Sequence, residues 1–184
     1  NGYRRSNKST PTFKMEQLLS LHPDVIPDRT LVAAMAVIAR DGQERHKAQK
    51  CWKLLQRMQQ PNLYAVTHVL NACIQTDADA DPNDKLEIFK VALATYEFAL
   101  TNAHTSSSLF GQFLQAAGNL VQSGSKRDKV VEATFRNCCD CGLVNEYVIE
   151  QFQRSGSEQL ELRIIGGFIE DGVRLEPEWS RNVH

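Results

Sequence analysis

The sequence predicts an all-α protein in which about four helix hairpins stack into an α-solenoid. Apolar residues recur at the three- and four-residue spacing of amphipathic helices from residue 27 onward, and no segment shows the alternation of a β-strand. A proline followed by a polar residue opens the stretch at Pro27, and the same boundary returns at Pro61. Because one hairpin cannot bury its apolar face alone, repeated hairpins are expected to stack. A non-repetitive helical bundle has the same periodicity and is the alternative.

The hairpin boundaries divide the chain into a tail, four units and a second tail. The predicted units are 27–60, 61–105, 106–144 and 145–165. A basic tail, or the end of a preceding unit, is expected at 1–26. An irregular tail is expected at 166–184, packed against the last helices or against a partner.

The first unit contains two helices separated by the turn residues Arg40–Gly42. The first helix is expected to start near Arg29. The second is expected over 46–59, with its apolar and basic residues on different sides. Pro61 then ends the hairpin, and Asn62 is expected to cap the next helix.

The second unit pairs a short helix with a longer one. The inner face of the short helix is expected to hold Val66, Val69, Leu70 and Cys73. The apolar stripe of the longer helix is expected to hold Leu86, Phe89, Leu93, Tyr96 and Leu100. Alternating aspartates between the two helices suggest a calcium loop, but Pro82 stands where that loop needs glycine and Ile88 where it needs glutamate. We therefore expect an acidic, solvated loop.

The third and fourth units follow the same plan. Apolar residues within 109–120 and 130–138 mark the two helices of the third unit, and the fourth unit is expected to hold helices over 145–154 and 159–165. Ser125 and Asp128 have the spacing of a capping box, and Gly142 is expected to end its helix in the left-handed conformation.

Three stretches of the chain share features of one repeat pattern. Ala48–Asn62 reads AQKCWKLLQRMQQPN, Pro61–Cys73 reads PNLYAVTHVLNAC, and Val130–Val144 reads VVEATFRNCCDCGLV. These stretches resemble the pentatricopeptide repeat family, whose unit is a helix pair ending in proline and Asp or Asn. The resemblance covers about residues 27–154 and implies a right-handed α-solenoid.

The resemblance also implies a function. This family binds single-stranded RNA in organelles, so the resemblance implies a non-catalytic, RNA-associated module of a chloroplast or mitochondrion. The base-reading position falls on Ala33, Thr67 and Gly111, of which only Thr67 has a hydrogen-bonding side chain; its companion position falls on Asn62 and near Thr105. The RNA-binding candidates on this face are Arg29, Arg40, Asn62, Thr67, Asn71, Gln115 and Asn119.

A protein scaffold, a subunit that holds a larger organellar complex without RNA contact, is the alternative function. The formal net charge of −1 favours it, although the first 60 residues are net basic. The partner-binding candidates are Lys47, Lys50, Lys53, Arg57 and Trp179. The basic face of these residues could instead dock on ribosomal RNA or remain solvated helix surface.

The sequence contains no motif for catalysis, a cofactor or a metal. It lacks a nucleophile elbow and a phosphate-binding glycine loop, and its five histidines lack metal spacing. Three of the five cysteines lie in CCDCG, which does not match paired zinc ligands. We expect reduced thiols in a reducing intracellular compartment. No apolar run reaches the about 18 residues of a membrane span, so no membrane insertion is expected.

Overall fold

The regular elements of the described chain are all helical. A computed structural model describes residues 20, 26–42, 44, 46–76, 79–167 and 176–183. Within these residues every regular element is an α-helix or a 3-10 helix, which confirms the predicted all-α class. Most of the predicted basic tail at 1–26 lies outside the described residues.

The helix bounds agree with the periodicity of the sequence. The described α-helices are α2 (Asp28–Arg40), α3 (Lys47–Leu55), α4 (Leu63–Ile74), α5 (Pro82–Thr101), α6 (Ser107–Leu120), α7 (Ser125–Cys141), α8 (Glu146–Ser155) and α9 (Glu158–Ile165). A 3-10 helix, η3 (Pro177–Ser180), follows near the C-terminus. α3 ends earlier than predicted, at Leu55 instead of Gln59.

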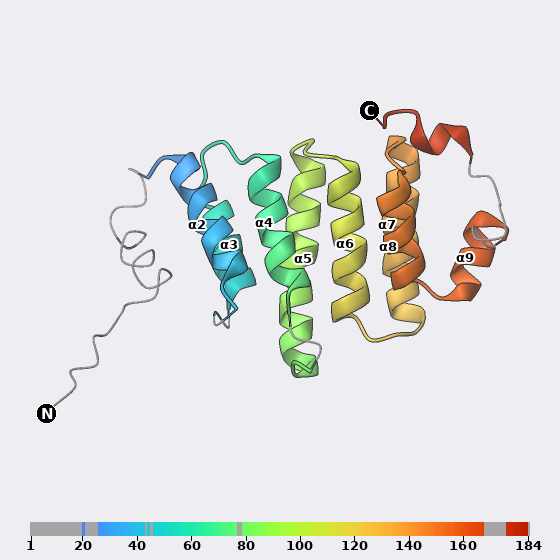
Figure 1. Cartoon of the computed structure of the whole chain (residues 1–184), viewed down its shortest axis with the longest axis horizontal. Helices are drawn as coiled ribbons and strands as arrows, with labels where there is room; N and C mark the ends of the chain where they lie inside the picture. Colours follow the sequence, from blue (N-terminus) through green and yellow to red (C-terminus); the bar gives the residue numbers. More distant parts are fainter. Residues whose placement is uncertain are drawn as a thin grey trace, which may run out of the picture.

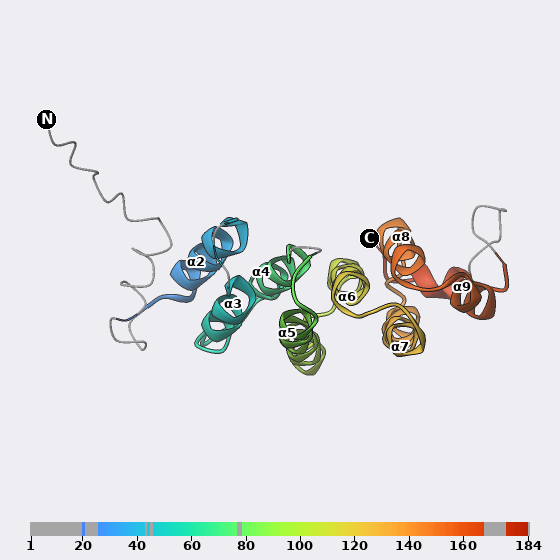
Figure 2. The same ribbon diagram turned by 90° about the horizontal axis from the view of Figure 1, so that it is seen from below.

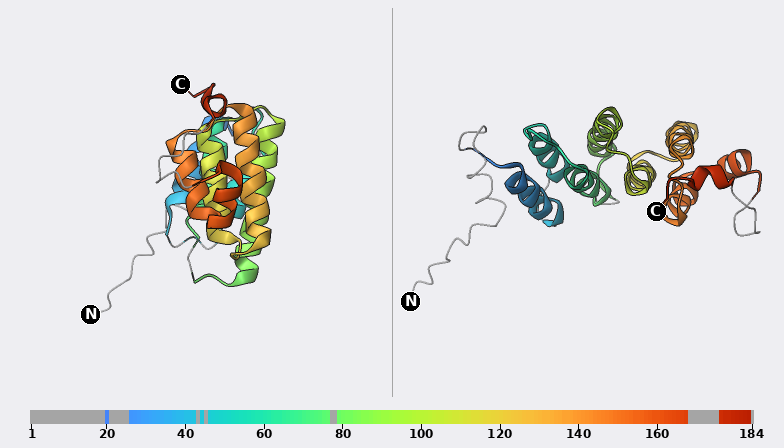
Figure 3. Two further views of the ribbon diagram at one scale, coloured as in Figure 1. Left: turned by 90° about the vertical axis from the view of Figure 1, so that its right-hand side faces the viewer. Right: turned by 90° about the horizontal axis from the view of Figure 1, so that it is seen from above.

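The helices follow one another along the long axis of the molecule, with their own axes roughly across it, and they form two rows (Figures 1 and 2). The first row holds α2, α4, α6 and α8, and each of these helices packs against the next one in the row. The second row holds α3, α5 and α7, and each packs against the first-row helices before and after it in the chain. The view from above shows the same alternation (Figure 3). Most helices therefore bury their apolar faces against neighbours close in sequence, while a right-handed superhelix remains a prediction.

Side-chain caps start five of the described helices, α4, α5, α6, α8 and α9. The side-chain oxygen of Asn62 accepts from the backbone N–H of Ala65 at 3.0 Å, as the sequence predicts. Ser106 and Asn145 cap α6 and α8 in the same way, at 3.1 and 3.0 Å. Asp81 caps α5 by accepting from the Asn83 N–H at 2.8 Å. These residues replace bonds that the first helical turns lack.

The predicted capping box at the start of α7 is wrong. Gly124 is the N-cap, and Ser125 is already the first helical residue. The Asp128 carboxylate instead accepts from the backbone N–H and the hydroxyl of Ser157, at 3.1 and 2.7 Å. Since Ser157 caps α9, Asp128 joins the start of α7 to the start of α9. The predicted left-handed cap is confirmed, because Gly142 has φ 66°.

Two glycines let α8 approach α6 closely. At Gly111 a side chain would run into the Tyr147 ring of α8. At Gly118, seven residues on and on the same face, an added Cβ would lie 2.6 Å from the Ser155 hydroxyl oxygen. That hydroxyl donates to the Leu114 carbonyl at 2.8 Å, in the space that the missing side chains leave. Close packing of α6 and α8 therefore depends on these glycines.

Aromatic rings join the two rows. Tyr96 of α5 stacks on Phe113 of α6 with centroids 4.2 Å apart, and the planes are nearly parallel at 4°. Phe135 of α7 stacks on Phe152 of α8 at the same separation. The edge of Trp52 in α3 meets Phe98 of α5 at 6.1 Å. Each pair crosses between hairpins or rows, so the rings fix how neighbouring helices sit.

The predicted apolar stripe of α5 is only partly buried. Leu86 is 51% exposed and Leu93 is 37% exposed, although both belong to the apolar residues by which the sequence marked this helix. The buried residues of α5 are instead Ala92, Thr95, Tyr96 and Ala99. The helix has apolar residues on more than one side, and the neighbouring helices cover one of those sides.

The segment around η3 closes the end of α7. The Asn182 side chain donates to the Cys141 carbonyl at 2.8 Å, and the Asn182 backbone N–H donates to the Gly142 carbonyl, also at 2.8 Å. The Arg181 guanidinium donates to the Asp140 carbonyl. These carbonyls belong to the last turn of a helix, where cations and donors are favoured. The described part of the C-terminal tail thus packs against α7.

We predict that Phe113→Ala lowers the free energy of unfolding by about 3–5 kcal/mol, because it removes a buried ring that contacts α5. Chemical denaturation followed by circular dichroism measures the change. The control is Tyr64→Ala, since Tyr64 is 74% exposed, and it should shift stability by no more than about 0.5 kcal/mol. Equal effects of the two substitutions would contradict the described packing.

Candidate functional site

The surface predicted to read RNA bases lies on the first row, and its three units differ. Ala33 on α2 is exposed, and Thr67 on α4 is half-buried. Gly111 on α6 is buried beneath the Tyr147 ring. The third predicted reading position therefore lies in the contact between α6 and α8, where no ligand reaches it.

Three predicted RNA-binding residues bond to neighbouring helices. The Asn71 side-chain oxygen accepts from the Gln112 amide at 3.0 Å and joins α4 to α6. The Asn119 amide donates to the Ile74 carbonyl at 3.1 Å and joins the same two helices. The Tyr147 hydroxyl donates to the Gln115 side-chain oxygen at 3.5 Å and joins α8 to α6. These polar groups therefore serve helix packing.

The companion position of the base-reading site also has a structural role. The side-chain oxygen of Asn62 caps α4, so it is occupied by a backbone N–H. Thr105 is exposed in the short link before α6. Both residues are exposed, but the side-chain oxygen of Asn62 is already bonded.

The two arginine candidates lie at opposite ends of α2, and both are exposed. Arg40 lies near His68 of α4. Burial, and then the positive charge of Arg40, lowers the pKa of His68. The imidazole is therefore neutral at neutral pH, and the positive charge in this area is that of the arginine.

The basic residues predicted to meet a partner do not form one free face. Lys50 pairs with Glu44 at 2.8 Å. Lys47 is half-buried, whereas Lys53 is exposed. Arg57 is exposed but lies beyond the end of α3. Only a longer α3 would align all four basic residues on one face. This helix stops too early, because Leu55 is its last residue.

Trp179, the predicted partner contact in the tail, packs within the chain. Its ring meets the edge of Phe135 with centroids 5.7 Å apart and planes at 89°. Its carbonyl accepts from the Val144 N–H at 2.8 Å. The ring is half-buried, so its main contact is the α7 helix.

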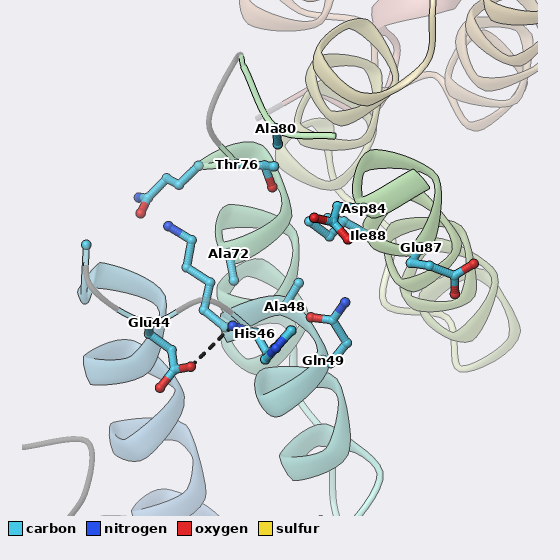
Figure 4. Close-up of a pocket in the computed structure, with 13 residues that line it drawn as sticks. Glu44, His46, Ala48, Gln49, Ala72, Thr76, Ala80, Asp84, Glu87 and Ile88 are labelled. Atoms are coloured by element: carbon cyan, nitrogen blue, oxygen red, sulfur yellow. Dashed lines mark hydrogen bonds between the residues drawn. The ribbon is translucent and has the colours of Figure 1, made fainter. Parts of the chain in front are cut away.

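A polar pocket of about 610 Å³ lies between α3, α4 and α5 (Figure 4). Glu44, Asp84 and Glu87 are among its lining residues. Glu44 accepts from the His46 N–H at 3.2 Å, whereas the Glu87 carboxylate points away from the pocket and pairs with Lys90 at 2.6 Å. The buried oxygen of the Gln49 amide accepts no hydrogen bond there. Among the described residues, no three His, Cys, Asp or Glu side chains gather as metal ligands.

A second hollow was missed by the sequence analysis. This α5–α7 groove has a volume of about 1010 Å³ and is lined by Lys85, Leu86 and Phe89 of α5, Leu120 of α6, and Lys126 and Val130 of α7, among others. The available signal was the number of apolar residues in α5, which exceeds what one buried face holds. Periodicity alone does not say which side a neighbour covers.

All five cysteines are free thiols, and four of them are buried. Burial raises the pKa of the Cys51 thiol to about 12 and also raises the pKa of Cys73. Burial likewise raises the pKa of Cys138, and it raises the pKa of Cys139 to about 12. Thiols of this kind remain protonated at neutral pH and react slowly.

Comparison with known proteins adds no relative. No family model, curated protein or solved structure matches the chain. None of the helices in the described residues has the length and apolar character to cross a membrane.

We predict that Gly111→Ala destabilises the protein by about 1–3 kcal/mol, because the new methyl group collides with Tyr147. Thermal denaturation measures the loss. Adding Tyr147→Ala should recover part of it, whereas Gly42→Ala should be nearly neutral, since nothing lies within 4 Å of a side chain there. A stable Gly111→Ala variant would show that α8 does not cover this position.

We predict that a disulfide reagent at pH 8 modifies about one thiol rapidly in the folded protein, namely the half-buried Cys141. The four buried cysteines should react only after denaturation, because their raised pKa values keep them protonated at this pH. Absorbance of the released thiolate measures the count. A Cys141→Ser variant that loses no fast-reacting thiol would refute this assignment.

Proposed function

We propose that this chain is a non-catalytic helical-repeat module whose main partners are proteins. In this proposal the helix hairpins form a right-handed α-solenoid that holds a larger complex. The alternation of helices between two rows supports a repeated architecture. The resemblance of residues 48–62 to pentatricopeptide repeats supports it from the sequence side. Proteins with this architecture bind through extended surfaces.

One observation carries the choice of protein over RNA. Asn71, Gln115 and Asn119 could read bases if their side chains were free, but each bonds to a neighbouring first-row helix. A side chain already bonded must break that contact to pair with a base. The first row is therefore poorly suited to sequence-specific RNA recognition.

Exposed apolar side chains favour protein partners independently. Tyr64 on α4 and Leu86 on α5 are 74% and 51% exposed. Tyrosine is enriched in protein interfaces, since it supplies a large ring and a polar tip.

RNA association is the second candidate, because Arg29 and Arg40 are both exposed on α2. These two arginines are the charged residues of the predicted RNA face, and both are open to solvent. Thr67 lies on the adjacent α4. Contacts of this kind hold the RNA backbone without reading its sequence. The resemblance places such a module in a chloroplast or mitochondrion, and free cysteines fit a reducing compartment.

An affinity capture experiment separates the two candidates. The tagged chain is used as bait in an organellar extract, with and without ribonuclease and at low and high salt. We expect one protein partner to remain bound, in fixed proportion to the bait, after both treatments. Recovery of the bait alone as a monomer would remove support for the proposal.

The RNA candidate is measured directly by filter binding with single-stranded RNA at low salt. Arg29→Glu combined with Arg40→Glu should weaken any binding about tenfold or more, because each reversal removes a phosphate contact. The matched control reverses Lys90 and Lys129, which are exposed on the second-row helices α5 and α7. RNA binding that survives the arginine change would argue against this face, and RNA-dependent capture would favour the second candidate over the first.

A further inference from the structure

The α5–α7 groove lies where the first turns of these two second-row helices are not in contact. Asn137 of α7 donates to the Tyr96 hydroxyl of α5 at 3.2 Å, so the two helices meet through side chains near their C-terminal ends. The groove instead lies beside the first turns of both helices, at Lys85, Leu86 and Lys126. α3 packs directly on α5, but α5 and α7 have no comparable contact among the described helices.

The inner surface of the groove is apolar. Leu86 is 51% exposed, and Phe89, Leu120 and Val130 continue the apolar surface from three helices. Phe89 stacks on Phe113 with centroids 6.1 Å apart, so its ring is held in place. A groove of about 1010 Å³ lies at the upper end of the volumes of small-molecule pockets and has room for several side chains of a partner.

The charges around the groove have one sign. Lys85 and Lys126 stand on its two sides, and no Asp or Glu is among the described residues that line it. The acidic residues at the start of α5, Asp84 and Glu87, line the polar pocket between α3 and α5 instead. The acidic residues at the start of α5 and the lysine with its two apolar neighbours therefore line different hollows.

The start of α7 also presents a lysine to the groove, while the acidic residue of its first turn, Asp128, bonds to Ser157 of α9. The N-cap of α7 is Gly124, which has no side chain to accept from the first backbone N–H groups. Lys126 in the same turn is exposed. Uncapped N–H groups and the helix dipole both favour a carboxylate at this end.

We propose that the α5–α7 groove is the docking site for an amphipathic, acidic segment of a protein partner. Apolar side chains of that segment cover Leu86 and Phe89, and its carboxylates lie beside Lys126. The segment thereby complements both the apolar surface and the charge. This inference rests on the proposed protein-binding function and assigns it a surface and a partner chemistry. RNA would pair with the lysines but leave the leucine uncovered.

A synthetic peptide pair tests the site on the full chain. The probe is a fluorescein-labelled peptide of about 16 residues, with leucines at the spacing of one helical face and glutamates elsewhere. One control peptide replaces the glutamates with lysines, and the other replaces the leucines with serines. Fluorescence anisotropy measures the dissociation constants, and we expect the acidic leucine peptide to bind at least about tenfold more tightly than either control.

Variants locate the binding on the molecule. Leu86→Glu should weaken the peptide about tenfold or more, because it removes a leucine contact and adds a repelling charge. Lys126→Glu should weaken it about fivefold or more, and the wild-type affinity should fall as salt rises. Leu93→Glu and Lys129→Glu are matched controls, because both residues are exposed on the same helices outside the groove lining, and they should change affinity less than about twofold. Circular dichroism confirms that each variant folds.

Several outcomes would overturn the inference. Equal binding of the lysine peptide, equal effects of groove and control variants, or no binding of the acidic peptide each contradicts it. Self-association that Leu86→Glu abolishes would mean that a second copy fills the groove. If the captured partner stays with both groove variants, the groove proposal fails while the proposed function stands; if no partner is captured but the peptide binds as expected, the reverse holds.

Discussion

The packing of α6 against its neighbours is the constraint on which the rest of the structure depends. This helix contacts α4, α5, α7 and α8, so it links the N-terminal hairpins to the C-terminal ones. It can do so because glycines at 111 and 118 leave one face almost flat, which Tyr147 and Ser155 of α8 then fill. A second face presents Phe110 and Phe113 to the Tyr96 ring. Small residues thus fix where α8 lies against α6, and large rings fix where α5 lies against it.

The same geometry explains what the surface offers a ligand. Polar side chains on first-row helices lie close enough to bond with each other, and they lose freedom that recognition of a base would need. On the second row, by contrast, some apolar side chains have no neighbouring helix to cover them. The neighbours of α5 cover one side of it, and Leu86 stays uncovered where α5 and α7 are not in close contact. Recognition is thus better supported on the second row than on the row that the repeat resemblance singles out.

Local features of this fold could be predicted from the sequence, whereas the facing of its helices could not. The Asn62 cap and the left-handed Gly142 depend on a few adjacent residues, and both are present. Asp128 was predicted to cap its own helix, but it bonds to Ser157 because α9 brings a competing donor from 29 residues away. Gly111 was predicted to face a ligand, since spacing identifies a helix face without identifying its neighbour. The α5–α7 groove is a property of two helices separated by α6, which no local pattern describes.

The bonds from Arg181 and Asn182 to the end of α7 have a consequence for synthesis on the ribosome. Most contacts in this molecule join elements that are near in sequence, so the early hairpins can form while later residues are still being added. The last turn of α7 differs, because the donors that bond to its carbonyl groups lie about 40 residues later in the chain. Until those residues emerge, water must solvate these carbonyls and the edge of Phe135 lacks its tryptophan. The hydrogen bonds at the end of α7 can therefore form only late in the synthesis of the chain.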